Sequence, residues 1–140
     1  MEEHTGSENE RIKHLEFIQA TIARLGNNSF LIRGWTVTVT GALIAVSVQV
    51  NEWRIAAVAL LIGFAFWILD ASYLRRERMF RLLYDEAALR NPPRVPLFSM
   101  DINPYMATIG WRKVITSSSI VMIYLPVLML DLAVACVLGT

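Results

Sequence analysis

The sequence contains few of the residue types that soluble enzymes use for chemistry. Its 140 residues include one cysteine and two histidines. The single cysteine, Cys136, excludes an intrachain disulfide and a CxxC metal site, and His4 and His14 both lie near the start. The sequence also lacks the P-loop, GxSxG and HExxH motifs. We therefore expect no catalytic residues, no metal site and no cofactor, and we predict that the protein is not an enzyme.

Charged residues are scarce as well. They make up 18% of the chain and leave a net charge of +1, whereas hydrophobic residues make up 55%. Without a basic excess, direct binding to nucleic acid is not expected. So large an apolar share in so short a chain predicts an all-α integral membrane protein, with membrane lipid as its first partner. The alternative, a soluble bundle of buried helices, would have to keep three long apolar runs away from water.

Three apolar runs are long enough to cross the hydrocarbon core of a bilayer. Residues 34–51 contain no charge, residues 55–74 contain only Asp70, and residues 114–140 contain only Asp131. A helix of about 20 residues spans the bilayer, so each run predicts a transmembrane helix. The chain then divides into an N-terminal amphipathic helix at 1–33, a transmembrane hairpin at 34–74, a helix and Pro-rich loop at 75–113, and a third transmembrane helix at 114–140.

The positions of lysine and arginine predict the orientation. Of the thirteen such residues, all except Arg54 precede the first run or lie between the second and the third. By the positive-inside rule, the N-terminus and the middle segment are cytoplasmic and the C-terminus faces out. Trp35, Trp67 and Trp111 are expected near the inner ends of the helices and Trp53 at the outer turn, unless they pack between helices.

The segments outside the apolar runs predict two cytoplasmic helices. Ile12, Leu15, Ile18, Ile22 and Leu25 recur every three or four residues and predict an amphipathic helix that ends at Gly26-Asn27-Asn28. The second transmembrane helix is expected to continue without a break through RRERMFRLLYDEAALR, where an apolar side can meet the first helix, and to end at Asn91-Pro92-Pro93. The apolar side of this extension consists of Met79, Leu82, Leu83 and Ala87.

The loop after this helix has two interpretations. The stretch PPRVPLFSMDINPY is either a plain connector or a docking segment for a soluble partner. Exposed apolar side chains would favour docking. The candidate docking residues are Phe98, Met100, Asp101 and Tyr105.

The first transmembrane helix has two unlike faces. On a helical wheel, one face is hydroxylic and consists of Thr36, Thr40, Ser47 and Asn51. The opposite face is small and consists of Gly34, Thr38, Gly41 and Ala45. Because small residues allow close helix approach, we expect this face to meet the small residues of the second helix, Ala56, Ala59 and Gly63. The hydroxylic face then looks toward the third helix, a neighbouring subunit or a water-filled path, or its hydroxyls simply bond to carbonyls of their own helix.

The two intramembrane aspartates each need a partner, because an ionised aspartate at the centre of a transmembrane helix costs about 2.5–3.5 kcal/mol. For Asp70, in the inner third, the candidate is Arg33, and the wheel favours a contact between subunits or a bent approach over a simple pair within the hairpin. Asp131 is expected in the outer third, on a stripe with Ser117 and Tyr124, and Arg54 is its nearest basic group by depth. Structural pairing and a role in an ion or proton path both remain open for the two aspartates.

Short motifs spread over about residues 10–130 form a pattern. They are Asn28-Ser29-Phe30, Gly34-Trp35, Phe66-Trp67-Ile68-Leu69-Asp70, Tyr73-Leu74, Glu77-Arg78, Phe98-Ser99-Met100-Asp101 and Tyr105. This pattern resembles that of small bacterial multi-pass membrane proteins, some of which accompany antiviral defence modules, including CRISPR-type ones; its LDxxYLxxER portion is the most specific part. The resemblance implies a bacterial inner-membrane (cytoplasmic-membrane) effector or accessory protein that assembles into a homo-oligomer and impairs the membrane once infection is sensed.

Two functions follow from these expectations. In the first, the protein is an oligomeric membrane effector, and a ring of copies forms a pore lined by the hydroxylic face of the first transmembrane helix or by the stripe with Ser117, Tyr124 and Asp131. In the second, it is a non-conducting anchor or adaptor that recruits a soluble protein at its cytoplasmic face. A small transporter is a third reading, although the chain has no inverted repeats.

Overall fold

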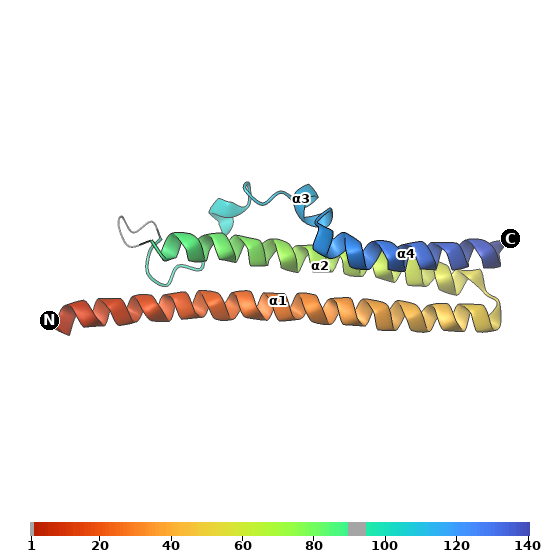
Figure 1. Cartoon of the computed structure of the whole chain (residues 1–140), viewed down its shortest axis with the longest axis horizontal. Helices are drawn as coiled ribbons and strands as arrows, with labels where there is room; N and C mark the ends of the chain where they lie inside the picture. The colour runs from red at the N-terminus through yellow and green to blue at the C-terminus, as the bar shows by residue number, and fades with distance from the viewer. Residues whose placement is uncertain (1, 90–94) are drawn as a thin grey trace.

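The chain folds into a long helical hairpin with a third helix packed along half of it (Figure 1). The computed structural model describes residues 2–89 and 95–140, with side chains from residue 6 onward. Within these residues the fold is all-helical. The elements are α1 (Glu2–Val50), α2 (Trp53–Ala87), the 3-10 helix η1 (Asn103–Tyr105), α3 (Trp111–Ile115) and α4 (Ser118–Gly139).

Three helices, α1, α2 and α4, are long and apolar enough to cross a membrane. At 1.5 Å per residue, α1 is about 73 Å long, more than twice the hydrocarbon thickness of a bilayer, so only part of it can lie in lipid. We call residues 34–50, 53–69 and 118–139 the apolar half of the bundle, and residues 2–33, 70–89 and 95–117 the polar half.

The two halves place their apolar side chains in opposite ways. In the polar half, Ile18, Met79 and Leu83 are buried and form a conventional core with Tyr105. In the apolar half, large side chains such as Phe64 and Met122 are exposed. The fully or almost fully buried polar residues of the apolar half are Thr36, Thr40, Ser47 and Asp131. A rod that is apolar outside along one half and apolar inside along the other suits lipid at one end and water at the other.

The helix end predicted at Gly26-Asn27-Asn28 is wrong, because α1 continues through these residues without a break. Glycine in a helix interior costs about 1 kcal/mol, which is small beside the packing of α1 on α2 along its whole length. The buried positions of α1 alternate in steps of four and seven residues, which makes an 11-residue repeat: His14, Ile18, Leu25, Ser29, Thr36, Thr40 and Ser47. Such a repeat keeps one side of a nearly straight helix against its neighbour.

The unbroken continuation of the second transmembrane helix is present, since α2 runs from Trp53 to Ala87. Its extension packs on α1 through Met79 and Leu83, as the spacing of apolar residues predicted. The stop predicted at Asn91-Pro92-Pro93 lies outside the described residues, as do Arg90 and Arg94 of the basic middle segment.

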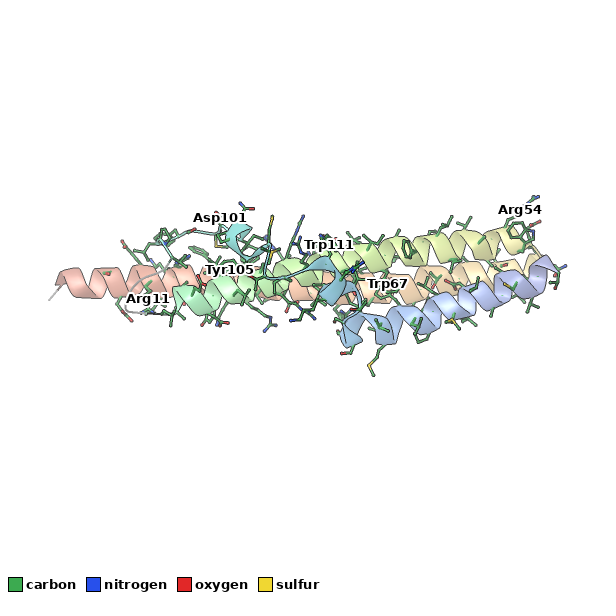
Figure 2. The ribbon with its side chains drawn as sticks, turned by 90° about the horizontal axis from the view of Figure 1, so that it is seen from above. Arg11, Arg54, Trp67, Asp101, Tyr105 and Trp111 are labelled. Carbon is green, nitrogen blue, oxygen red and sulfur yellow. The ribbon has the colours of Figure 1, made fainter. Side chains whose placement is uncertain are left out.

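The third transmembrane helix begins at Ser118 and not at Val114 as predicted, because Thr116 and Ser117 separate α3 from α4. The indole nitrogen of Trp67 donates to the carbonyl oxygen of Ile115 at 3.3 Å, and Arg78 donates to the hydroxyl of Ser117 at 3.1 Å. Both bonds hold the connection between α3 and α4 against α2. Figure 2 shows α3 with Trp111 over the middle of the rod, Arg54 at the turn end, and Asp101 and Tyr105 over the polar half.

Candidate functional site

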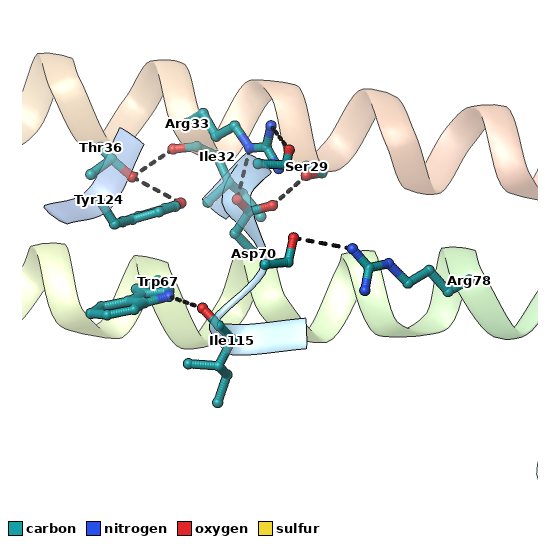
Figure 3. Close-up of polar contacts among 11 residues, drawn as sticks. Ser29, Ile32, Arg33, Thr36, Trp67, Asp70, Arg78, Ile115 and Tyr124 are labelled. Carbon is teal, nitrogen blue, oxygen red and sulfur yellow. Dashed lines mark hydrogen bonds and ion pairs between the residues drawn. The ribbon is translucent and has the colours of Figure 1, made fainter. Parts of the chain in front are cut away.

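A cluster of polar side chains joins the three long helices near the border between the two halves (Figure 3). Asp70 of α2 is fully buried. Its Oδ2 accepts from Nε of Arg33 at 2.8 Å, and its Oδ1 accepts from the hydroxyl of Ser29. Arg33 also donates to the hydroxyl of Ser119 on α4 at 3.2 Å. We call Ser29, Arg33, Asp70 and Ser119 the border cluster.

The border cluster pairs Arg33 with Asp70 inside one chain, whereas the helical wheel favoured a contact between subunits or a bent approach. The pair lies within one chain because Ser29 and Arg33, one turn apart on α1, both reach the level of Asp70. The Arg33 side chain is 21% exposed, and the Asp70 side chain is not exposed at all. Removing either partner would leave the other charge poorly compensated, which is strongly destabilising in buried pairs.

A second group of contacts fixes α4 to α1 and α2. Trp67 stacks on Tyr124, with ring centroids 6.1 Å apart and an interplanar angle of 11°. The hydroxyls of Thr36 and Tyr124 lie 3.5 Å apart. Trp67 therefore packs between helices, which was the alternative to an interfacial position, whereas Trp35, Trp53 and Trp111 are exposed.

The hydroxylic residues proposed for a water-filled path face the other helices of the same chain. Thr36 and Thr40 donate to carbonyls one turn back, those of Ile32 and Thr36, at 2.8 and 2.7 Å. Ser47 donates to the carbonyl of Glu52 at 2.9 Å. Asn51 does not belong to this face: it lies in the turn between α1 and α2 with a φ of 54° and is exposed. The φ is positive because the chain reverses there, and asparagine tolerates that region.

The predicted meeting of two small faces is wrong. Gly34, Thr38, Gly41 and Ala45 are all exposed, and a Cβ added at either glycine would meet nothing within 4 Å. Ala56, Ala59 and Gly63 are buried as expected, but they face the hydroxylic side of α1, with Gly63 next to Thr40. The physical reason is that hydroxyl and carboxyl groups are costly toward lipid, so most of them take the interior; Thr38, which stays outside, donates to the carbonyl of Gly34 at 3.0 Å.

Asp131 is 1% exposed, and its Oδ2 has no hydrogen-bond partner among the described residues. The expected pairing of Asp131 with Arg54 is not formed. The Arg54 side chain is 78% exposed, and its Nε lies 3.8 Å from Oε1 of Glu52. The position of Asp131 also differs from the prediction. Its carboxylate faces Gly63, which lies ten residues, or about 15 Å, from the start of α2, and hence near the middle of the apolar half rather than in its outer third.

A groove of about 520 Å³ lies in the polar half, between α1 and the loop before η1. We call it the loop groove; it is lined by His14, Phe17, Ala20, Thr21, Arg24, Phe98 and Met100. Phe98 adopts a φ of 61°, a region that costs a bulky residue energy. Its ring lies 5.8 Å from that of His14 and 6.4 Å from that of Phe17, and His14 Nε2 donates to the carbonyl of Ser99 at 2.9 Å.

The four candidate docking residues have different surroundings. Phe98 is 47% and Met100 is 38% exposed, and both line the loop groove. Asp101 is exposed, and its carboxylate accepts from the amide of Asn103 at 2.9 Å, which shapes the loop. Tyr105 is not available for docking, because it is a buried member of the polar-half core.

Tyr105 is held by Glu86 of α2, to which its hydroxyl donates at 2.7 Å. Burial, followed by the hydrogen bond to Glu86 and the nearby charges of Glu86 and Asp101, raises the pKa of Tyr105 to about 12. The neutral phenol is therefore the form that stabilises the loop.

Arg75 also fixes this loop, and no sequence pattern distinguishes it from the neighbouring arginines. Its Nε and Nη2 donate to the carbonyls of Ile109 and Met106, each at 2.8 Å. Its guanidinium lies 5.3 Å from the ring centre of Trp111, a cation–π contact. The Arg75 side chain of α2 thus holds both ends of the segment between η1 and α3 in place.

Over residues 2–89 and 95–140, no three His, Cys, Asp or Glu side chains come together in a way that could hold a metal ion. No known protein family matches the chain, and no curated protein or solved structure is significantly similar to it.

Proposed function

We propose that this protein is a membrane-anchored adaptor of the bacterial inner membrane that docks a soluble protein through the loop groove. The observation that carries the proposal is the exposure of Phe17, Phe98 and Met100 around one groove in the polar half, where water would otherwise surround them. Exposed apolar side chains gathered in this way are typical of interaction sites.

The apolar half supports a role as an anchor. The polar groups of Thr36, Thr40, Ser47 and Asp131 face inward and its outer surface is mostly apolar, so a single copy offers lipid a largely hydrophobic boundary. The basic residues of α1, α2 and α3 support an orientation with the N-terminus and the polar half in the cytoplasm, since Arg54 is the one described basic residue at the opposite end.

The groove fits a helix or turn of the partner that inserts one or two apolar side chains. Its lining includes the apolar side chains of Phe17, Ala20 and Phe98, and Arg24 supplies a positive charge. A partner with an acidic residue beside its apolar anchor would match both features, because rim charges guide orientation and apolar anchors provide most of the affinity.

Site-specific photo-cross-linking in intact cells tests the adaptor. A photoreactive residue at Met100 should give one adduct of defined mass, and the same residue at Met106, which is exposed but outside the groove, should not. With the partner purified, Phe98→Ala should weaken its binding at least tenfold and Met106→Ala should leave it unchanged. Binding that is insensitive to both Phe98→Ala and Phe17→Ala would rule out the groove.

A second candidate is the oligomeric, pore-forming effector that the resemblance to defence-associated proteins implies. The observation that favours it is the line of buried polar groups, Thr36, Thr40, Ser47, Tyr124 and Asp131, which could face water if the helices of several copies rearranged into a ring. Dye release from liposomes, measured with purified protein, separates the candidates: an adaptor that stays intact releases no dye, whereas an effector releases dye once triggered.

A further inference from the structure

Among the described residues of the apolar half, Asp131 has the one buried side-chain oxygen, Oδ2, that has no hydrogen-bond partner. Its Oδ2 lies 3.6 Å from the position that a Cβ on Gly63 would occupy, beside the methyl groups of Thr40 and Leu128. The hydroxyl of Thr40, whose methyl group lies at the same glycine, donates to the carbonyl of Thr36. At Gly63, α1 and α4 thus supply methyl groups and α2 supplies a glycine, instead of hydrogen-bond donors.

No charged group balances Asp131 from the elements packed against it. On α1 and α2 the nearest ion pair is Arg33–Asp70, and Asp70 lies seven residues, or about 10 Å, along α2 from Gly63. At the other end, Glu52 lies in the turn and is partly exposed, and Arg54 lies in the first turn of α2 and is exposed. On α4 itself, Asp131 is the only acidic or basic residue. An ionised carboxylate without a partner in such surroundings is costly enough that a carboxyl group takes up a proton instead.

We propose that Asp131 is a proton-binding site in the middle of the apolar half: it is a neutral carboxylic acid in the packed bundle and exchanges its proton only when α4 moves away from Gly63. Pro126, five residues before Asp131, lacks the amide that would bond the carbonyl of Met122, so α4 can bend at this point. The bend would bring water to Asp131 without unfolding the rest of the bundle. This inference does not depend on the adaptor function.

Infrared difference spectroscopy of the full chain in lipid nanodiscs tests the proposal. At neutral pH, wild type minus Asp131→Asn should contain a carboxylic-acid carbonyl band. The control difference, wild type minus Asp85→Asn, should contain carboxylate bands instead, because Asp85 is exposed. Carboxylate bands in the Asp131 difference would overturn the proposal. If the Asn variant does not fold, wild-type protein labelled with ¹³C-aspartate provides the same test. A carboxylic-acid carbonyl band that shifts with the label shows a protonated aspartate, and the absence of such a band overturns the proposal.

The role of α4 is tested by hydrogen–deuterium exchange at Asp131. After transfer to deuterated water, the rate of exchange is read from the shift of the carboxylic-acid band. Pro126→Ala restores a backbone donor to the helix and should slow this exchange at least threefold. An unchanged rate would show that the proton leaves by another route and would overturn the proposed link to α4 movement.

Discussion

At the scale of single residues, the two buried aspartates of this protein are stabilised in different ways. Asp70 accepts from both Arg33 and Ser29, whereas Oδ2 of Asp131 accepts from no described group. The difference follows from position. Asp70 lies at the border, where an arginine can reach it and still keep part of its guanidinium exposed, and Asp131 lies about 10 Å deeper, where no basic side chain reaches.

We expect Asp70→Leu to destabilise the bundle by about 2–3 kcal/mol, because it leaves Arg33 without its partner and Ser29 without an acceptor. The partial exposure of Arg33 keeps this below the cost for a fully buried pair. Thermal unfolding in detergent measures the loss. The matched control is Asp85→Leu on the exposed side of α2, and equal midpoints for the two variants would contradict the importance of the border cluster.

We expect Tyr105→Phe to destabilise the polar half by about 1 kcal/mol at neutral pH, through loss of the hydrogen bond to Glu86. The effect should depend on pH. Because folding raises the pKa of Tyr105 from 10.0 to about 12, the stabilisation by the neutral phenol is fully present below pH 10 and is lost as the pH rises toward 12. Denaturant unfolding of both proteins across this range measures the difference, which should shrink as the pH rises; a constant difference would argue against the raised pKa.

At the scale of helices, the glycines show which face of each element packs. A Cβ at Gly63 would lie 2.9 Å from Leu128 Cδ2, whereas a Cβ at Gly41 would meet nothing. We therefore expect Gly63→Leu to separate α4 from α2 at a cost of about 1–3 kcal/mol. Gly41→Leu should be neutral or slightly stabilising, since leucine is the better helix former. Thermal midpoints and cross-linking between α2 and α4 provide the measurement. A larger loss of stability for Gly41→Leu than for Gly63→Leu would instead support the packing of the two small faces that the sequence predicted.

The sequence predicted the helices better than their contacts. Long uncharged runs determine where a helix can lie in lipid, so the three apolar helices and the unbroken α2 could be expected. The residues Gly26-Asn27-Asn28 predicted a helix end that is not there, because the packing of α1 on α2 outweighs the cost of about 1 kcal/mol for a glycine inside a helix. The prediction that Gly34 and Gly41 face α2 was also wrong, because all sides of an apolar run are hydrophobic and the pattern does not show which side is buried.

The candidate site was predictable only where charge or spacing limited the choices. Arg33 was the available partner for Asp70 by depth, and the three hydroxyl residues Thr36, Thr40 and Ser47 do share one face. Tyr105 could not be separated from Phe98 and Met100, because loop residues have no period that distinguishes core from surface. The roles of Arg75 and Trp67 depend on backbone carbonyls of a distant segment, which a sequence does not reveal.

At the scale of the whole molecule, the rod has one end suited to lipid and one suited to water, so its orientation can be tested from both sides of the membrane. In a Cys136→Ser background, Glu52→Cys at the turn should react with a membrane-impermeant maleimide outside the cell. Asp85→Cys on the polar half should react only after the membrane is opened, because the positive-inside rule places it in the cytoplasm. Labelling of Asp85→Cys in intact cells would reverse the proposed orientation.

The length of α1 determines how far the loop groove stands from the bilayer surface. Arg24 and Phe17 precede Gly34 by ten and seventeen residues, or about 15 and 26 Å of helix. A domain of 100 residues has a radius of gyration of about 13 Å, so a partner seated in the groove would rest in the corner between the rod and the lipid headgroups. It would be confined to a thin layer beside the membrane, where even weak attraction to headgroups adds to its retention.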